Sequence, residues 1–82
     1  MISVVLKLCG PLRDVVGRDE MHLTIKPPYT GVDAFSALAA AHPKVRTWQR
    51  SVRLAVNLEY VPSDHVLHDG DEICFVPPVS GG

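Results

Sequence analysis

The sequence predicts an α+β domain in which a sheet packs on one main helix. Three observations predict it: several short segments in which apolar and polar residues alternate, one longer segment with helical spacing, and the order of these segments along 82 residues. Alternation with a period of two indicates strands, whereas apolar residues three and four positions apart indicate a helix. The order is strand, strand, helix and three further strands, which is typical of a sheet with its helix on one face.

The N-terminal part of the chain predicts a hairpin. The first strand is indicated by the alternating apolar residues Ile2, Val4, Leu6 and Leu8. Gly10-Pro11 ends this strand, and residues 12–16 have room for one helical turn before Gly17. The second strand is indicated by Met21, Leu23 and Ile25. Because only a loop of moderate length separates the two strands, we expect them to pair in antiparallel fashion.

The main helix follows Pro27-Pro28, which closes the second strand. Thr30 and Asp33 resemble a capping box, although Glu or Gln is the usual residue at the second position. One helical stripe is predicted to contain Val32, Phe35, Leu38, Ala39 and His42. His42-Pro43 ends the helix, because the residue before proline avoids helical backbone angles. Residues 44–51 are basic and polar, and we expect Trp48 to anchor an irregular connection or a short helix there.

Three short strands are predicted in the remainder, over residues 53–57, 59–61 and 72–76. Asp69-Gly70-Asp71 indicates the turn before the last strand. Pro77-Pro78 ends ladder pairing, because proline has no N–H to donate. We therefore expect one domain over residues 1–76, followed by a flexible tail over residues 77–82.

Composition disfavours several classes of protein. The chain is 46% hydrophobic and 21% charged, which is typical of a globular domain. No apolar run approaches the roughly 20 residues that span a bilayer, so no membrane association is expected. The apolar N-terminus has no basic region before it and is interpreted as a strand, which favours a cytoplasmic protein. The basic residues are scattered without a set of aromatic residues for stacking, so nucleic-acid binding is not expected.

The net charge of −1 hides an asymmetry along the chain. All eight Lys and Arg residues lie in residues 7–53 with four acids, which gives +4, whereas residues 54–82 contain five acids and no Lys or Arg, which gives −5. One interpretation is that the acids belong to solvated turns. The other is that the C-terminal part docks on basic surfaces of partners.

The side chains offer little catalytic chemistry. His65 and His68, with Asp64 and Asp69 beside them, match no defined metal-site spacing and are interpreted as a solvated loop, so no metal is expected. Cys9 and Cys74 form neither a CxxC pair nor a disulfide framework, and no base is indicated that would activate either one. The sequence has no GxSxG elbow and no glycine-rich loop before a helix. An enzyme that acts alone is therefore disfavoured.

The chemistry is expected instead in the tail Pro77-Pro78-Val79-Ser80-Gly81-Gly82. The prolines hold the tail extended as it leaves the last strand. Glycine lacks a Cβ, so Gly81-Gly82 is the slimmest peptide available and can enter a narrow channel. The terminal carboxyl group is ionised at neutral pH and must be activated, for instance as an acyl-adenylate, before sulfur can attack it. A frayed, inert tail is the plainer alternative.

The chain resembles the small subunit of molybdopterin synthase, the MoaD family of ubiquitin-like sulfur carriers. The most specific match is the ending, residues 75–82, and it is supported by residues 12–17, 55–57, 59–61 and 69–72. The resemblance covers essentially the whole chain. It implies a β-grasp (ubiquitin-like) fold, in which a mixed sheet packs on one main helix and the first and last strands lie parallel at the sheet centre.

The resemblance also implies partners and cofactors. An E1-like (MoeB-like) adenylyltransferase would activate Gly82 with ATP and Mg²⁺ bound on that partner, with no cofactor held by the chain itself. A sulfurtransferase would then supply sulfur to form a thiocarboxylate. The large synthase subunit (MoaE-like) would receive the tail in a heterotetramer, where sulfur passes to a pterin precursor in molybdenum cofactor biosynthesis.

The implied site residues fall into two groups. Gly82 carries the adenylate and thiocarboxylate, and Gly81 provides its slim approach. The remaining residues contact partners, either along the tail or on the sheet face beside it: Pro77, Pro78, Val79, Ser80, Val76, Cys74, Cys9 and Arg13. We expect the two cysteines to lie on neighbouring strands, reduced, as small apolar contact residues. Many relatives carry aromatic residues at such positions, and this chain does not.

Three alternatives stay open at this stage. A thiamine-type (ThiS-like) sulfur carrier has the same fold and ending, although such chains are usually shorter between the helix and the third strand. A ubiquitin-like protein modifier would use the same activated carboxyl group. A β-grasp interaction module with an inert tail would use none of this chemistry.

Overall fold

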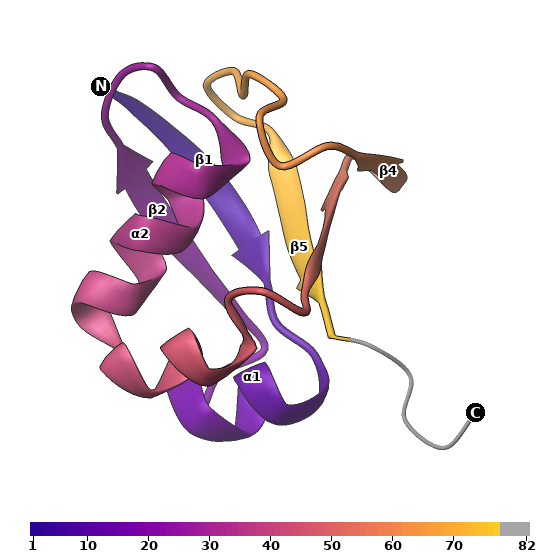
Figure 1. Ribbon diagram of the computed structural model, residues 1–82. Helices are drawn as coiled ribbons and strands as arrows, with labels where there is room; N and C mark the ends of the chain where they lie inside the picture. The colour runs from indigo at the N-terminus through magenta and orange to yellow at the C-terminus, as the bar shows by residue number, and fades with distance from the viewer. Residues whose placement is uncertain (78–82) are drawn as a thin grey trace.

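The computed structural model describes residues 1–77, in which α2 lies across one face of a five-stranded sheet and α1 lies at one end of that sheet (Figure 1). In chain order the elements are β1 (Ile2–Lys7), α1 (Gly10–Val16), β2 (Glu20–Ile25), α2 (Gly31–Ala41), the 3-10 helix η1 (Pro43–Trp48), β3 (Arg53–Val56), β4 (Glu59–Val61) and β5 (Glu72–Val76). Every predicted strand is present in the order that the sequence indicates. Residues 78–82, most of the predicted tail, lie outside the described residues.

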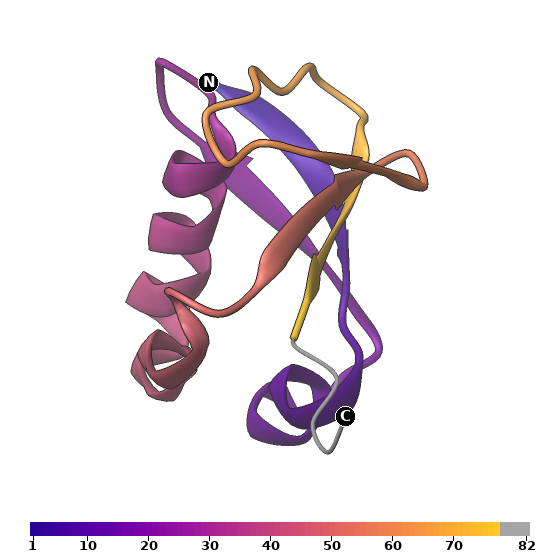
Figure 2. The same cartoon turned by 45° about the vertical axis from the view of Figure 1, so that its right-hand side comes forward.

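The strand order is β2-β1-β5-β3-β4, so the last strand of the chain lies at the centre of the sheet (Figure 2). β1 pairs with β2 in antiparallel fashion, which confirms the predicted hairpin. β1 and β5 are parallel, with Lys7 opposite Cys74. β3 pairs antiparallel with both β5 and β4. This topology confirms the β-grasp arrangement that the resemblance implies.

Two predicted boundaries are corrected. The first strand ends at Lys7, before Leu8 and before Gly10-Pro11. Gly10-Pro11 begins α1 instead, because proline is well suited to the first turn of a helix, where its missing N–H is not needed. The third strand ends at Val56 and not at Asn57, because Asn57 has left-handed backbone angles (φ 49°) and starts a tight turn.

The start of α2 confirms the capping box. The Thr30 hydroxyl accepts a hydrogen bond from the Asp33 N–H, and the Asp33 carboxylate accepts one from the Thr30 N–H at 2.8 Å. The predicted stripe was wrong at Val32, whose side chain is 51% exposed. The buried stripe begins one residue earlier and contains Gly31, Ala34, Phe35, Leu38 and Ala39. Gly31 takes the inward position because the helix start lies against β3, where no side chain fits.

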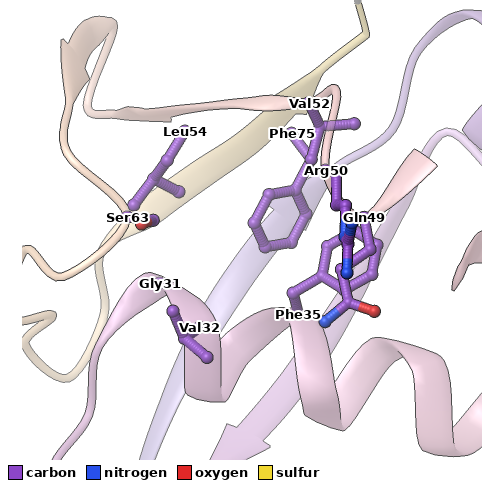
Figure 3. A pocket seen from close by; sticks show the side chains of 9 residues that line it. All are labelled: Gly31, Val32, Phe35, Gln49, Arg50, Val52, Leu54, Ser63 and Phe75. Carbon is purple, nitrogen blue, oxygen red and sulfur yellow. The ribbon is translucent and has the colours of Figure 1, made fainter.

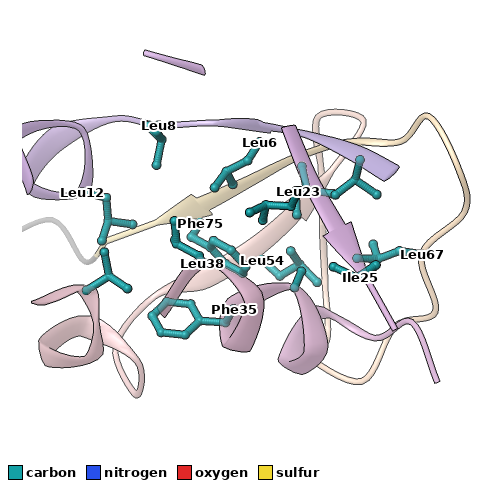
Figure 4. Packing of buried hydrophobic residues seen from close by; sticks show 14 of the residues in the cluster. Leu6, Leu8, Leu12, Leu23, Ile25, Phe35, Leu38, Leu54, Leu67 and Phe75 are labelled. Carbon is teal, nitrogen blue, oxygen red and sulfur yellow. The ribbon is translucent and has the colours of Figure 1, made fainter. Parts of the chain in front are cut away.

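The core fills the space between the sheet and α2 (Figure 4). Its centre is an edge-to-face pair of Phe35 from α2 and Phe75 from β5, with ring centroids 5.0 Å apart. The expected anchor Trp48, at the end of η1, is half-buried and packs against this core, and Val45 is fully buried. Within residues 1–77, no helix lies over the opposite face of the sheet (Figure 1). Within the described residues, no helix has the length and apolar character that crossing a membrane requires.

Candidate functional site

The predicted tail begins at Pro77, directly after the central strand β5. Pro77 is half-buried and lies beside Gly10, where a Cβ in place of the glycine hydrogen would lie 3.4 Å from the proline ring. Gly10 has a positive φ of 58°, which glycine adopts without strain. The chain therefore leaves β5 at the end of the sheet next to α1. The predicted residues Pro78, Val79, Ser80, Gly81 and Gly82 lie outside the described residues.

Cys9 and Cys74 lie together as expected, but they are not on neighbouring strands, because β1 ends at Lys7 and Cys9 lies beyond it. Their sulfur atoms are 3.8 Å apart, and both thiols are free and half-buried. Cys74 belongs to β5, and Cys9 follows β1 immediately before α1. Burial raises the pKa of the Cys74 thiol to about 11, and the neighbouring Cys9 and Glu72 contribute to the rise. Cys74 is therefore protonated at neutral pH and is a poor nucleophile.

The face of the sheet opposite α2 is called the open face below. Because strand side chains alternate, the residues next to the buried ones point toward it. At its centre Lys7 of β1 is opposite Cys74 of β5, and Val5 is opposite Glu72; Val5, Lys7, Cys74 and Val76 are half-buried, whereas Glu72 is exposed. Lys7 forms a salt bridge with Glu20 on β2, which raises the pKa of the lysine and lowers that of the glutamate. The open face therefore combines half-buried apolar residues with charged side chains on β1 and β5.

The open face does present an aromatic residue, although none stands at Cys9, Cys74, Val76 or Arg13. Tyr60 of β4 is paired with Ala55 of β3, on the side away from the buried Leu54. The guanidinium carbon of Arg53 lies 4.2 Å from the centre of the Tyr60 ring, a cation–π contact. In β3, Arg53 and Ala55 alternate with the apolar residues Leu54 and Val56, so Ala55 points to the open face. Tyr60 is paired with Ala55 and therefore points the same way, but this follows only once the hairpin register is known.

Arg13 was expected near the face that carries Cys9, Cys74 and Val76, as a residue that contacts partners. It lies on α1 with a largely exposed side chain, and its guanidinium Nη1 is 3.5 Å from Asp19 Oδ1. Its ion pair is thus with the loop before β2 and not with a group on the open face. Cys9, Cys74 and Val76 are brought together by the sheet, whereas Arg13 belongs to the edge next to α1.

A pocket of about 330 Å³ lies on the opposite side of the sheet, between the start of α2 and β3 (Figure 3). Phe35, Leu54 and Phe75 give it an apolar floor, and Arg50 is the only ionisable side chain among its lining residues. The pocket is therefore separate from the open face and from Pro77. In residues 1–77, no group of three or more His, Cys, Asp or Glu side chains is placed to hold a metal ion.

Comparison with known proteins adds to this geometry. A model of the ThiS family matches residues 6–82. The chain belongs to the ThiS family. The molybdopterin synthase sulfur carrier subunit of Chlamydomonas reinhardtii is 36% identical to this ThiS-family chain over 72 residues, which cover 85% of the chain and 87% of the relative.

Solved structures agree with the ThiS-family assignment. The crystal structure of SAMP1 from Haloferax volcanii has a TM-score of 0.83 and 30% identity, and the match covers 98% of this chain and 99% of that one. A putative molybdopterin converting factor subunit 1 from Pyrococcus furiosus has a TM-score of 0.83 and 26% identity, covering 96% and 100% of the two chains. The resemblance and the fold predicted from the sequence are therefore confirmed.

Proposed function

We propose that this ThiS-family protein is the sulfur carrier subunit of a molybdopterin synthase. The observation that carries the proposal is the position of β5. It is the central strand, held by β1 on one side and β3 on the other, and it delivers Pro77 at one end of the sheet. The family match continues to Gly82, and a relative that matches over most of both chains is named as this carrier subunit.

The reacting group is the carboxylate of Gly82. An E1-like adenylyltransferase supplies ATP and Mg²⁺; a carboxylate oxygen bonds to the α-phosphorus and pyrophosphate leaves. Sulfide delivered by a sulfurtransferase then attacks the acyl carbon through its sulfur, the acyl–oxygen bond breaks, and AMP leaves with the bonding electron pair. The product is a thiocarboxylate, whose sulfur is passed to a pterin precursor. The folded domain contributes a rigid base for the tail, because β5 is paired on both sides.

The open face is the surface proposed to meet the large synthase subunit. Its half-buried strip next to Pro77 includes Cys9, Cys74 and Val76. Lys7, Arg53 and Tyr60 extend this surface with one aromatic ring and two cations, of which Lys7 is already paired within the chain. Tyrosine and arginine are enriched among the few residues that contribute most of the binding energy of protein interfaces. We therefore assign Tyr60 and Arg53 to the docking surface, beside the tail.

Protein modification is the second candidate function. The observation that favours it is the likeness to SAMP1, since another crystal structure describes the H. volcanii protein as small archaeal modifier protein 1. The same activated Gly82 carboxyl group would then be attacked by an amine of a target protein and not by sulfur. The two functions share the adenylate and diverge only in the nucleophile.

The test is intact mass spectrometry after incubation with the cognate activating enzyme, ATP and a sulfur donor. The carrier should gain the mass difference between sulfur and oxygen, and a matched variant with one extra residue after Gly82 should not. The loaded protein, mixed with the large subunit and pterin precursor, should return to its starting mass as the precursor gains sulfur. Absence of the mass gain with an active enzyme would falsify the carrier function. Adducts on lysines of other proteins, without precursor conversion, would favour protein modification.

A further inference from the structure

The two cysteines of the chain lie on the proposed docking surface, and they form a close pair whose thiol chemistry the proposed function does not use. Their sulfur atoms are 3.8 Å apart although the residues are 65 positions apart in the sequence. This separation is a non-bonded contact, whereas a disulfide needs sulfur atoms about 2.05 Å apart. The sheet creates the pair: β1 and β5 run parallel with Lys7 opposite Cys74, and the chain after β1 carries Cys9 back over β5.

The backbone around the pair leaves room for the sulfur atoms to approach. Cys74 is held in the central strand, but Cys9 lies beyond the end of β1, with extended angles (φ −145°, ψ 159°) and no ladder pairing. Gly10 follows it with a positive φ. Both side chains are half-buried, so a small reagent can reach them from the open face. A disulfide requires the sulfur atoms to close from 3.8 Å to about 2.05 Å, and Cys9, which is outside the strand ladder, is the residue that would move.

A metal-binding role is disfavoured by the surroundings. Within residues 1–77 no third His, Cys, Asp or Glu completes a group with the two thiols that would hold an ion. A purely packing role explains two small side chains in contact, but it does not require both to be thiols. The property that the pair has, and that alanine or serine would lack, is the ability to form a covalent bond across the sheet.

We propose that Cys9 and Cys74 are a dithiol–disulfide couple that reacts with low-molecular-weight disulfides such as oxidised glutathione. In the first step the sulfur of Cys9 attacks one sulfur of the reagent, which releases one thiol and leaves a mixed disulfide on Cys9. In the second step the sulfur of Cys74 attacks the Cys9 sulfur, which releases the second thiol. The protein loses two protons and two electrons in total, and one molecule of reagent takes them up and is reduced to two thiols.

The order of attack follows from the surroundings of Cys74. Burial, as the largest cause, raises the pKa of its thiol to about 11, so Cys74 is the poorer attacking group and reacts second. The charged groups nearest to it are Glu72 on its own strand and Lys7 opposite on β1, and Ala55 on β3 is uncharged. This inference does not depend on the proposed function, because the couple forms within the isolated protein.

The experiment is titration of the purified protein with glutathione buffers of increasing oxidised fraction, followed by alkylation of free thiols and intact mass measurement. The wild type should lose the mass of two hydrogen atoms and accept no alkyl group. Proteolytic mapping should place the bond between Cys9 and Cys74. Two thiols in contact have an effective concentration far above the millimolar level of groups joined by a flexible linker, so the second thiol should attack the mixed disulfide as soon as it forms. The mixed disulfide should therefore stay below about a tenth of the protein.

The matched variants are Cys9→Ser and Cys74→Ser. Cys74→Ser should capture one glutathione on Cys9 and stop there, and neither variant should lose two hydrogen atoms. The oxidised wild type should melt about 5 °C or more above the reduced form, because the bond joins residues far apart in the chain. Two alkylated thiols in the wild type at the most oxidising ratio, or an intermolecular dimer as the main product, would overturn the couple. Both of these results come from the wild type, so they do not depend on whether the variants fold.

Discussion

Gly31 shows how a single residue fixes the distance between two elements. It occupies the first turn of α2 at the position that faces β3. A Cβ placed there would press on the Leu54 side chain and would lie 2.9 Å from the Ser63 carbonyl oxygen. The next N–H, that of Val32, donates a hydrogen bond to the same carbonyl at 3.1 Å, so the loop and the helix are tied at this point. The close approach therefore requires the absence of a side chain.

Gly31→Ala tests this requirement. Alanine favours helices over glycine by about 1 kcal/mol, but overpacking a tight contact costs about 1–3 kcal/mol. We expect the contact to dominate, because the Ser63 carbonyl is backbone and is held by the Val32 N–H. The free energy of unfolding, measured in urea, should fall by about 1–2 kcal/mol. Ser36→Ala, at an exposed position of the same helix, is the control and should be neutral or slightly stabilising. A Gly31→Ala protein as stable as the wild type would contradict the close contact.

At the scale of elements, the turn between β3 and β4 has an unusual sequence. Asn57 and Leu58 both have positive φ, 49° and 73°, and two-residue hairpins of this kind favour Asn-Gly. Asn57 suits its place, because its side chain donates to Asp71 and accepts from the Glu72 N–H. Leu58 gains nothing from burial, since it is 92% exposed. The hydrogen bonds of Asn57 therefore stabilise the hairpin, whereas the left-handed backbone of Leu58 strains it.

Leu58→Gly should stabilise the protein. Left-handed backbone angles cost a residue with a Cβ roughly 1–2 kcal/mol of folding free energy, and glycine relieves this cost. Glycine also has more conformational freedom in the unfolded chain, which takes back about 0.4–1 kcal/mol of that stabilisation. A net increase of about 0.5–1 kcal/mol in the free energy of unfolding is expected from these two terms. Leu58→Ala keeps the Cβ and should change little. If alanine stabilised as much as glycine, the exposed leucine side chain, and not the backbone, would be the source of the strain.

The sequence predicts those features that depend on near neighbours in the chain. Alternation places the strands, and Thr30 with Asp33 places the start of α2. The stripe of α2 was misplaced because two phases, one through Val32 and one through Gly31, share Phe35, and glycine has no side chain for a hydrophobic pattern to detect. Leu58 gives no sign of its left-handed angles, because the pairing of β3 with β4 and β5 imposes them.

Local sequence patterns could not predict contacts between distant parts of the chain. The parallel pairing of β1 with β5 joins residues far apart in sequence and came only from the family resemblance. The site follows the same division. Cys9 and Cys74 were placed together through that pairing, whereas Tyr60 was missed, because the three residues of β4 are too few to set the phase of an alternation. The structure shows the register of β3 with β4, and this register places Tyr60 on the open face.

At the scale of the whole molecule, the turn before β5 bears on the charge asymmetry of the sequence. Asp69 accepts a hydrogen bond from the Ser3 N–H at 2.8 Å, and Asp71 accepts one from the His68 N–H at 2.9 Å. Two of the five C-terminal acids thus hold the turn that leads into the central strand. The interpretation that these acids belong to turns is favoured for this pair, and a docking role is left to Glu59, Asp64 and Glu72, which are exposed.

The core is complete before the chain reaches the tail. All five strands end by Val76, and Phe75 is the last residue of the buried cluster. A chain that ends at Pro77 should therefore melt within about 2 °C of the full-length protein, while losing all capacity for sulfur loading. A chain that ends at Ile73 is the matched control and should not fold, because it loses Phe75 and most of the strand between β1 and β3, leaving two half-sheets without a centre. A large drop in melting temperature for the chain ending at Pro77 would mean that residues 78–82 stabilise the fold as well as carrying the reacting group.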